Sequence, residues 1–160
     1  MRNFVFRQAL AGLFLLVMTS AGAAQSQQPA TAPFPLPEKL EYRIEWRLIT
    51  AGMATVRLSR APGNLWETNL KIESAGFVTK LYRVLDTYRA LTNDRFCGVS
   101  TTLDAQEGKR HKYTILSFDN GRRKVQYEER DLLKNKSTNK TLEVPPCTHE
   151  IIGSLSALRM

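Results

Sequence analysis

Residues that carry catalytic chemistry are scarce in this 160-residue chain. His111 and His149 are the only histidines, Cys97 and Cys147 are the only cysteines, and no Gly-x-Ser-x-Gly sequence occurs. A nucleophilic enzyme needs a nucleophile beside a base, and no such pair is recognisable here. Paired carboxylates such as Glu128-Glu129 would point to opposite faces of a strand. We therefore predict no catalytic residue, no metal site and no cofactor, and an enzyme is the weaker hypothesis.

Long apolar runs are also missing from most of the chain. After residue 24, no stretch approaches the roughly 20 apolar residues that a transmembrane helix needs. The N-terminus has a shorter run: Arg2 and Arg7 precede apolar residues 9–17, and small residues follow at 20–25. This pattern is typical of a secretory signal peptide. We predict that residues 1–24 are removed and that the mature protein is exported to the bacterial periplasm, soluble and not transmembrane.

The remaining chain divides into a leader and one domain. Residues 25–37 (QSQQPATAPFPLP) are rich in Pro, Gln and Ala, a composition that buries too little apolar surface to fold, so we predict a flexible leader. Residues 38–160 are long enough for a single domain. Removal of the signal peptide takes away two arginines and no acid, which lowers the formal net charge from +8 to 8 − 2 = +6.

The two cysteines predict one disulfide. In an oxidising compartment, Cys97 and Cys147 would pair and close a long loop. The alternative is a metal site that uses Cys147, His149 and Glu150 in the segment PPCTHE. It lacks a standard ligand spacing and a fourth ligand, so we favour the disulfide.

Strict alternation predicts that residues 40–48 form a strand. One face would be apolar and the other charged, because side chains of an extended strand alternate between faces. The apolar positions are Leu40, Tyr42, Ile44, Trp46 and Leu48, and the charged ones are Lys39, Glu41, Arg43, Glu45 and Arg47. The alternation breaks at Ala51-Gly52-Met53-Ala54. Glycine at a strand junction permits positive φ or close approach of another backbone, so we predict a tight hairpin there, with or without a bulge.

Further extended segments predict an antiparallel meander at residues 55–59, 65–73, 86–92, 99–103, 112–118 and 124–130. Asn120-Gly121 predicts a hairpin with positive φ at both turn residues. The polar segment KNKSTNK (134–140) predicts a second hairpin loop. Helical spacing of Phe77, Leu81 and Val84 predicts a short helix, and Ile151, Leu155 and Leu158 share one face of another over residues 150–160. The fold class is therefore mainly β, a curved antiparallel sheet or partial barrel with one or two short helices. Because the chain ends inside the last helical pattern, we expect the C-terminal part to be incomplete.

Four segments in order carry a family resemblance. They are EYRIEWRLITAGMATVRLS, ESAGFVTKLYRVLDTYRALTND, EGKRHKYTILSFDNG and VPPCTHEIIGSLSALR. Together they resemble the exported bacterial proteins grouped as domain of unknown function thirty-one-oh-eight, over about residues 38–160. The resemblance implies a periplasmic, largely antiparallel β protein and supplies no catalytic residues. Members more often carry Asp where this chain has Glu150, and they usually continue past the last helix.

A ligand site is predicted beside Gly52, where the small residues Ala51 and Ala54 would leave a hollow. The apolar residues of the first strands would form its concave face, which also includes Ile44, Leu58 and Ile72. The predicted ligand-binding residues are Tyr42, Trp46, Gly52, Val56, Trp66 and Leu70.

A basic segment follows. Residues 109–140 contain ten Lys or Arg and four Asp or Glu. We predict a basic rim that attracts anionic headgroups of the envelope, with the alternative that these charges only protect a solvated sheet edge from aggregation. No nucleic-acid partner is expected, because no recognition helix or aromatic platform is present. The rim residues are Lys109, Arg110, Lys112, Arg122, Arg123 and Lys124.

Three functions follow in order of preference. The first is a periplasmic, non-enzymatic protein that binds an apolar or amphipathic envelope molecule such as a lipid. The second is an envelope scaffold or assembly protein that pairs its edge strands with a partner protein. The third is a hydrolase with Asp86 as general base, although we expect that carboxylate to accept hydrogen bonds from the backbone or from Arg83 or Arg89.

Overall fold

The computed structural model describes residues 36–158, which lie within one compact unit that spans residues 32–160. The predicted signal peptide and almost all of the predicted leader fall outside the described residues.

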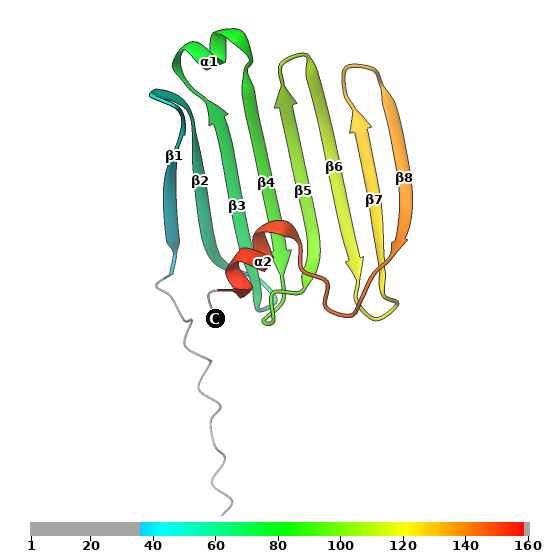
Figure 1. The fold of residues 1–160 in the computed structure, drawn as a ribbon. Helices are drawn as coiled ribbons and strands as arrows, with labels where there is room; N and C mark the ends of the chain where they lie inside the picture. Colours follow the sequence, from blue (N-terminus) through cyan, green and yellow to red (C-terminus); the bar gives the residue numbers. More distant parts are fainter. Residues whose placement is uncertain (1–35, 159–160) are drawn as a thin grey trace, which may run out of the picture. The chain divides into compact units, whose positions relative to one another are not determined.

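Eight antiparallel strands form one sheet in which every strand pairs with its neighbours in sequence (Figure 1). The mainly β prediction is confirmed, and the sheet is open, with β1 and β8 as its edges. The strands are β1 (Glu38–Trp46), β2 (Ile49–Ala61), β3 (Leu65–Ser74), β4 (Val84–Thr92), β5 (Gly98–Glu107), β6 (Arg110–Asp119), β7 (Lys124–Asp131) and β8 (Lys136–Glu143). Two short helices accompany them, α1 (Gly76–Leu81) between β3 and β4 and α2 (Ile151–Ala157) after β8.

The turns of this meander divide between two ends of the sheet. At the α1 end lie α1 and the β1–β2, β5–β6 and β7–β8 turns (Figure 1). At the α2 end lie the β2–β3, β4–β5 and β6–β7 turns, together with α2. Successive turns alternate between the ends because each strand reverses the direction of the chain.

The period-two pattern gives the sheet two different faces. Residues that pair across antiparallel strands share a face. The α2 face therefore carries the apolar series predicted for the first strands, including Val56 opposite Leu70 and Leu58 opposite Thr68. The opposite face carries mostly polar side chains, such as Arg57 opposite Asn69. The apolar face is covered by α2 only at one end of the sheet, and Tyr42 and Ile44 on β1 remain exposed.

The break at residues 51–54 is a β-bulge inside β2. Ile44 pairs with Gly52 but Glu45 pairs with Thr50, so Ala51 is the extra residue. A Cβ on Gly52 would lie 2.5 Å from the carbonyl oxygen of Glu73, so the glycine is needed for close approach to β3. The hairpin turn itself lies earlier, at Arg47 and Leu48. The predicted strand included these two residues, but β1 ends before them.

Two other predicted turns differ in detail from the structure. Asn120-Gly121 lies in a hairpin connection, but it is a longer loop whose left-handed residue is Arg123 (φ 56°). Asp119 explains the difference, because its side chain accepts a hydrogen bond from the backbone of Arg122 and stabilises the wider loop. The predicted loop 134–140 is mostly the edge strand β8, because its backbone pairs with β7 from Lys136 onward.

Glu150 caps the start of α2, and its carboxylate accepts hydrogen bonds from the backbone N–H groups of Ile152 and Gly153. Gly153 allows the helix to lie close to the sheet, since a Cβ there would be 3.0 Å from Thr92. Ile152, Gly153 and Ser156 are buried. The predicted apolar stripe of Ile151, Leu155 and Leu158 is instead exposed, because the helix turns Ile152, Gly153 and Ser156 toward the sheet.

A small core lies at the α2 end. It consists of Leu58, Trp66 and Phe96, with Ala157 of α2 packed against it. Trp66 is 2% exposed, and its ring stacks on Phe96 at 5.2 Å between centroids. The loop between β4 and β5 holds Phe96 in this position through hydrogen bonds from Arg95 and Cys97 to the Asn93 side chain.

The predicted disulfide between Cys97 and Cys147 is confirmed, across a sequence separation of 50. It joins the residue before β5 to the segment that leads into α2. Gly98 also donates a backbone hydrogen bond of 2.9 Å to the carbonyl of Thr148. These two links fix the path of the chain between β8 and α2.

Candidate functional site

An apolar groove lies on the α2 face, over β5 to β8. It encloses about 330 Å³, within the range of small-molecule pockets. Paired positions supply its floor: Leu103 faces Thr114, Thr101 faces Leu116, and Phe118 faces Val125. Because paired residues share a face, the floor is contiguous across strands. The lining residues are Tyr88, Thr101, Leu103, Thr114, Leu116, Phe118, Val125, Leu142, Val144, Thr148, His149, Glu150 and Ile151.

The absence of a side chain at Gly98 makes room for the Phe118 ring. A Cβ on Gly98 would lie 3.0 Å from three carbon atoms of the Phe118 ring. The ring therefore lies over the backbone of Gly98, which keeps Phe118 low on the sheet. Any larger residue at position 98 would push the ring into the groove.

The segment that leads into α2 forms one end of the groove. Tyr88 on β4 donates a hydrogen bond of 2.5 Å from its hydroxyl to Oε2 of Glu150, which is 5% exposed. Burial raises the pKa of Tyr88, and the hydrogen bond to Glu150 raises it further. The phenol therefore stays protonated and acts as a donor. The carboxylate of Glu150 is engaged by this donor and by the helix backbone, so its role is to position α2.

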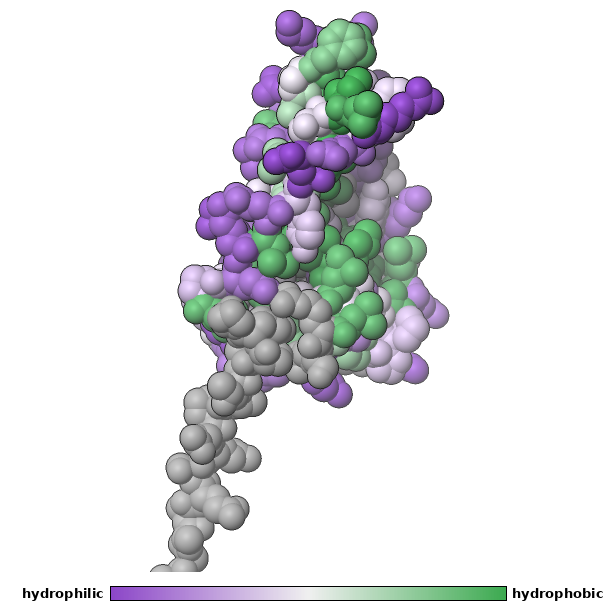
Figure 2. Space-filling view, turned by 60° about the vertical axis from the view of Figure 1, so that its left-hand side comes forward, coloured by the Kyte–Doolittle hydropathy of each residue, from purple (hydrophilic) through white to green (hydrophobic). Residues whose placement is uncertain are grey.

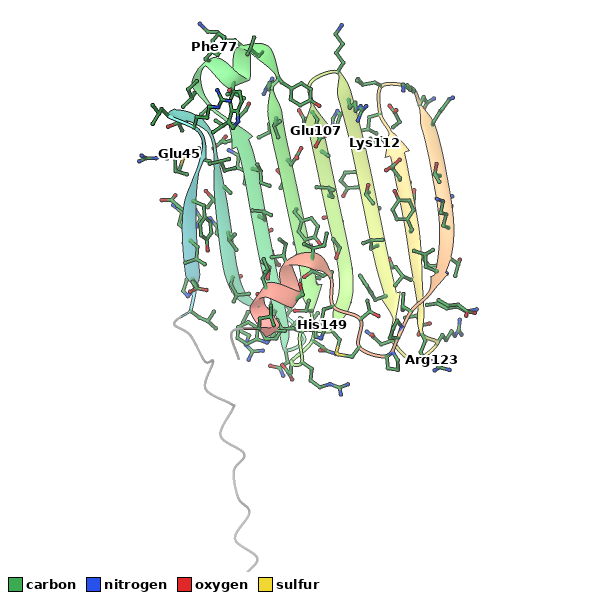
Figure 3. The ribbon with its side chains drawn as sticks, in the orientation of Figure 1. Glu45, Phe77, Glu107, Lys112, Arg123 and His149 are labelled. Atoms are coloured by element: carbon green, nitrogen blue, oxygen red, sulfur yellow. A yellow bond between two sulfur atoms is a disulfide. The ribbon has the colours of Figure 1, made fainter. Side chains whose placement is uncertain are left out.

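His149 stands beside this end of the groove, near the start of α2 (Figure 3). Its Nδ1 lies 2.8 Å from the carbonyl oxygen of Phe96. A carbonyl only accepts, so Nδ1 carries a proton and donates to this oxygen. His149 thus adds an imidazole to the end of the groove that Tyr88 and Glu150 also line.

A polar network borders the groove at the other end of the same strands. Lys112 donates to Oε1 of Glu129 at 2.8 Å, and the Tyr127 hydroxyl donates to Oε2 at 2.9 Å. Glu129 pairs with the groove residue Thr114. The hydrogen bond from Lys112 is the main cause that holds the pKa of Glu129 below its usual value. The carboxylate therefore stays ionised beside the groove.

The predicted ligand-binding residues are on the same face but in the other half of the sheet. Val56 and Leu70 are paired, and Tyr42 and Gly52 lie nearby on β1 and β2. Trp46 is at the α1 end, whereas Trp66 is buried beneath α2 at the opposite end. The structure therefore brings four of the six predicted residues into one neighbourhood and separates the two tryptophans.

The predicted basic rim is divided in two. Lys109, Arg110 and Lys112 lie at the α1 end, and Arg122, Arg123 and Lys124 lie at the α2 end. Lys112 and Arg123 are well separated along β6 and β7 (Figure 3). A strand of ten residues such as β6 spans roughly 30 Å, so the two groups do not form one surface. None of the six lines the groove, and Lys112 is linked to it through Glu129, which pairs with Thr114.

Asp86 lies on β4 outside the groove. Its Oδ1 accepts a hydrogen bond of 3.0 Å from the backbone N–H of Gln106. A backbone donor was one of the two kinds predicted for this carboxylate. Within residues 36–158, no hydrogen bond from the other kind, Arg83 or Arg89, reaches it. Burial raises the pKa of Asp86, and the nearby Glu107 and Asp104 carboxylates raise it further.

Comparison with known families decides the classification. Residues 41–160 match the family described as protein of unknown function, DUF3108. The chain belongs to the DUF3108 family. No curated protein and no solved structure matches it. In this DUF3108 protein, the groove over β5 to β8 is formed by residues of the matched region.

Two further observations concern the described residues of this DUF3108 protein. In the part of the chain that the structure describes, no helix is long and apolar enough to cross a membrane. Over the same residues, no three His, Cys, Asp or Glu side chains converge on a point that would hold a metal ion. Cys147 of the alternative metal site is bonded to Cys97, and Glu150 caps α2.

Sequence reasoning missed the groove although part of its signal was present. Leu116 and Phe118 alternate with polar residues on β6, and Val125 follows the turn to β7. These positions share a face with Leu103, as the register shows. The strands with tryptophan show a stronger apolar pattern, because large aromatic residues dominate a pattern of apolar positions.

Proposed function

We propose that this protein binds one apolar or amphipathic envelope molecule in the groove over β5 to β8, without chemical conversion. The observation that carries the proposal is the groove itself, whose floor of Leu103, Leu116, Phe118 and Val125 is open to a ligand. Burial of apolar ligand surface there would contribute about 25 cal/mol per Å² before the costs of association.

The two ends of the groove favour an amphiphile over a pure hydrocarbon. One end offers the His149 imidazole, and the other offers the Lys112–Glu129–Tyr127 network. A ligand with an apolar body and a polar group at one end satisfies both kinds of surface. A few placed polar groups in an apolar pocket are typical of small-molecule sites.

An exported, periplasmic location supports the same function. The N-terminal pattern of residues 1–24 predicts export, and the Cys97–Cys147 disulfide is typical of oxidising compartments. Lipids and other amphiphiles of the envelope are available there, and a protein that shields their apolar parts from water has a clear use.

The test fills the groove and leaves the fold intact. Thr114→Trp adds an indole to the groove floor on β6. Ser117→Trp adds the same group to the opposite, solvated face of the same strand and is the matched control. We expect the parent and Ser117→Trp to bind cis-parinaric acid and to retain a stoichiometric amphiphile in native mass spectrometry, and Thr114→Trp to lose both. Equal binding by all three folded proteins would refute the groove as the site.

Edge-strand pairing in an envelope scaffold is a second candidate, favoured by β8. All eight residues of β8 are exposed, and an edge strand presents unpaired backbone groups to a partner strand. The N–H of Val144 donates to the carbonyl of Arg123 and so points toward β7. The N–H groups of successive residues in a strand point alternately to its two sides, so the N–H of Asn139, an odd number of residues away, points to the free edge. Asn139→Pro should therefore abolish partner capture and leave ligand binding in the groove unchanged, whereas Thr114→Trp should do the reverse.

A further inference from the structure

The turns at the two ends of the sheet differ in composition. At the α2 end they contain Pro62-Gly63-Asn64, Asn93-Asp94 and Asn120-Gly121, the residue types that turns usually carry. At the α1 end, large apolar side chains stand in solvent instead, and Leu48 at the tip of the β1–β2 turn is fully exposed. Within residues 36–158, the exposed large apolar side chains of this end are Trp46, Leu48, Ile49, Phe77, Leu81, Tyr82, Leu132 and Leu133.

The helix α1 directs its apolar side chains outward. Phe77, Lys80 and Leu81 are exposed and share one face, because helix residues three and four apart are neighbours. The N–H of Ala75 donates to the carbonyl of Ala51 at 2.9 Å, which holds the start of α1 beside β2 and the β1–β2 turn. Figure 2 shows hydrophobic side chains gathered at the top of the molecule, where α1 lies, with hydrophilic ones around them.

Basic side chains surround these apolar groups. The turn between β5 and β6 lies against the end of α1, since the N–H of Gly108 donates to the carbonyl of Arg83 at 2.7 Å. Leu81 and Tyr82 line a hollow together with Lys109 and Arg110. No ion pair among the described residues involves the basic side chains of this set, which are Arg47, Lys80, Arg83, Lys109 and Arg110.

Acidic residues at this end are fewer and mostly engaged. Glu45 pairs with Arg43 at 3.6 Å. Asp131 accepts hydrogen bonds from the backbone of the β7–β8 turn and lies 3.9 Å from Lys134. Glu107 is the remaining carboxylate of the β5–β6 turn. The α1 end therefore combines protruding apolar side chains with an excess of positive charge.

We propose that the α1 end is a docking surface for a lipid bilayer that contains anionic lipids. Leu48, Phe77 and Leu133 enter the boundary between headgroups and acyl chains, and the basic residues contact lipid phosphates. Trp46 and Tyr82 are suited to this boundary because their rings are apolar with a polar tip. A protein partner fits less well, since a standard interface takes about 20–30 residues a side and this end offers separate turn tips. The surface is independent of the groove.

Tryptophan fluorescence tests the proposal at the surface itself. The chain has two tryptophans, of which Trp46 is 63% exposed at the α1 end and Trp66 is 2% exposed beneath α2. The chain without the predicted signal peptide, residues 25–160, is mixed with vesicles of phosphatidylcholine and phosphatidylglycerol in equal amounts. We expect a blue shift of the emission as Trp46 leaves water, and brominated lipids should quench it. Trp46→Phe should lose both effects while vesicle binding persists.

Paired variants distinguish binding through this surface from nonspecific hydrophobic adsorption. Leu48→Ser with Leu133→Ser removes two tip leucines, and Leu155→Ser with Leu158→Ser removes two exposed leucines of α2 as the matched control. We expect the first pair to lose the Trp46 shift and the second to keep it. No shift in the parent protein, or an equal loss in both pairs, overturns the proposal and leaves a protein partner as the occupant of this end.

Charge variants test the role of anionic lipid. Each Lys or Arg near an anionic membrane strengthens binding about fivefold. Lys80→Glu with Lys109→Glu should therefore weaken binding to the mixed vesicles by more than about 25-fold, whereas Arg123→Glu with Lys124→Glu at the α2 end should change it little. Binding of the parent to phosphatidylcholine alone that equals its binding to the mixture contradicts the anionic part of the proposal.

Discussion

The hydroxyl of Tyr88 on β4 donates a hydrogen bond of 2.5 Å to Oε2 of Glu150, 62 residues later in the chain. The same carboxylate accepts from Ile152 and Gly153 at the start of α2. One side chain therefore determines both where the helix begins and where it rests on the sheet. Since Tyr88 and Glu150 also line the groove, the stability of this contact and the shape of the groove are linked.

Tyr88→Phe should lower the free energy of unfolding by about 1.5–3 kcal/mol, the usual contribution of a hydrogen bond to a charged group. The buried carboxylate would lose a donor while the ring volume stays the same. Urea denaturation measures the change. Tyr127→Phe is the control, because its partner Glu129 keeps the hydrogen bond from Lys112 and less than about 1 kcal/mol should be lost.

The stability of the protein should also fall at high pH because of Tyr88. Burial and then Glu150 raise the pKa of Tyr88 above its ordinary value of 10.0. Below that value the phenol is protonated in both folded and unfolded chains, so the stabilisation is complete. Above it the unfolded chain ionises first, and stability is lost as the pH rises toward the folded pKa. Denaturation curves from pH 8 upward should show a smaller decline for Tyr88→Phe, and parallel declines would contradict this assignment.

Reduction of the Cys97–Cys147 disulfide should cost about 4 kcal/mol, the chain entropy released when a loop of this length is opened. Cys97 is buried, so alanine is the suitable replacement. Urea denaturation of the parent with and without reductant measures the effect. The double variant Cys97→Ala with Cys147→Ala should be insensitive to reductant, and a parent protein that is equally insensitive would show that the bond does not restrict the unfolded chain.

Gly52→Ala should destabilise the protein by about 1–3 kcal/mol, because the strands of the bulge must move apart to admit the methyl group. The added Cβ would meet the carbonyl oxygen of Glu73 at 2.5 Å. Thermal or urea unfolding gives the measurement. Gly121→Ala is the control, since its Cβ would lie 3.5 Å from Asp119 Oδ1. That change should alter the free energy of unfolding by less than about 0.5 kcal/mol. Equal effects at both sites would contradict the close approach of Gly52 to β3.

Asp86→Asn should make the protein slightly more stable at pH 7, by less than about 1 kcal/mol because the site is partly solvated. Burial raises the folded pKa of Asp86 above the ordinary value of 3.8, so ionisation near and above that pH opposes folding. Asparagine keeps the acceptor for Gln106. The free energies of unfolding of the parent and of Asp86→Asn should differ at pH 7 but not at pH 3. A less stable Asp86→Asn at pH 7 would show that the ionised carboxylate favours folding, contrary to this prediction.

Strand positions were predictable from the sequence because alternation reports directly on a sheet with one apolar and one polar face. Residues 65–73 illustrate this, since they correspond to β3 almost residue for residue. Local composition predicted secondary structure less reliably where pairing with another strand decides whether a segment is extended. The polar residues from Lys136 form β8 because the backbone of β7 offers them a partner, and side-chain polarity does not oppose an edge position.

The candidate site was harder to predict because it depends on how distant segments combine. The groove needs the shared face of Leu103, Leu116 and Phe118, the absence of a side chain at Gly98, and the crossing of the chain into α2. None of these is local. The orientation of α2 was missed for a related reason, since close packing through Gly153 outweighs burial of Leu155.

The sequential order of the strands has a consequence for folding. Each strand pairs only with its neighbours in sequence, so the sheet can grow hairpin by hairpin with short loop closures, which favours rapid folding. The crossing from β8 back to α2 is different, because it brings Cys147 to Cys97 and Glu150 to Tyr88 over long separations. We expect it to form last. The groove then gains its end wall only when oxidation and helix docking complete the fold.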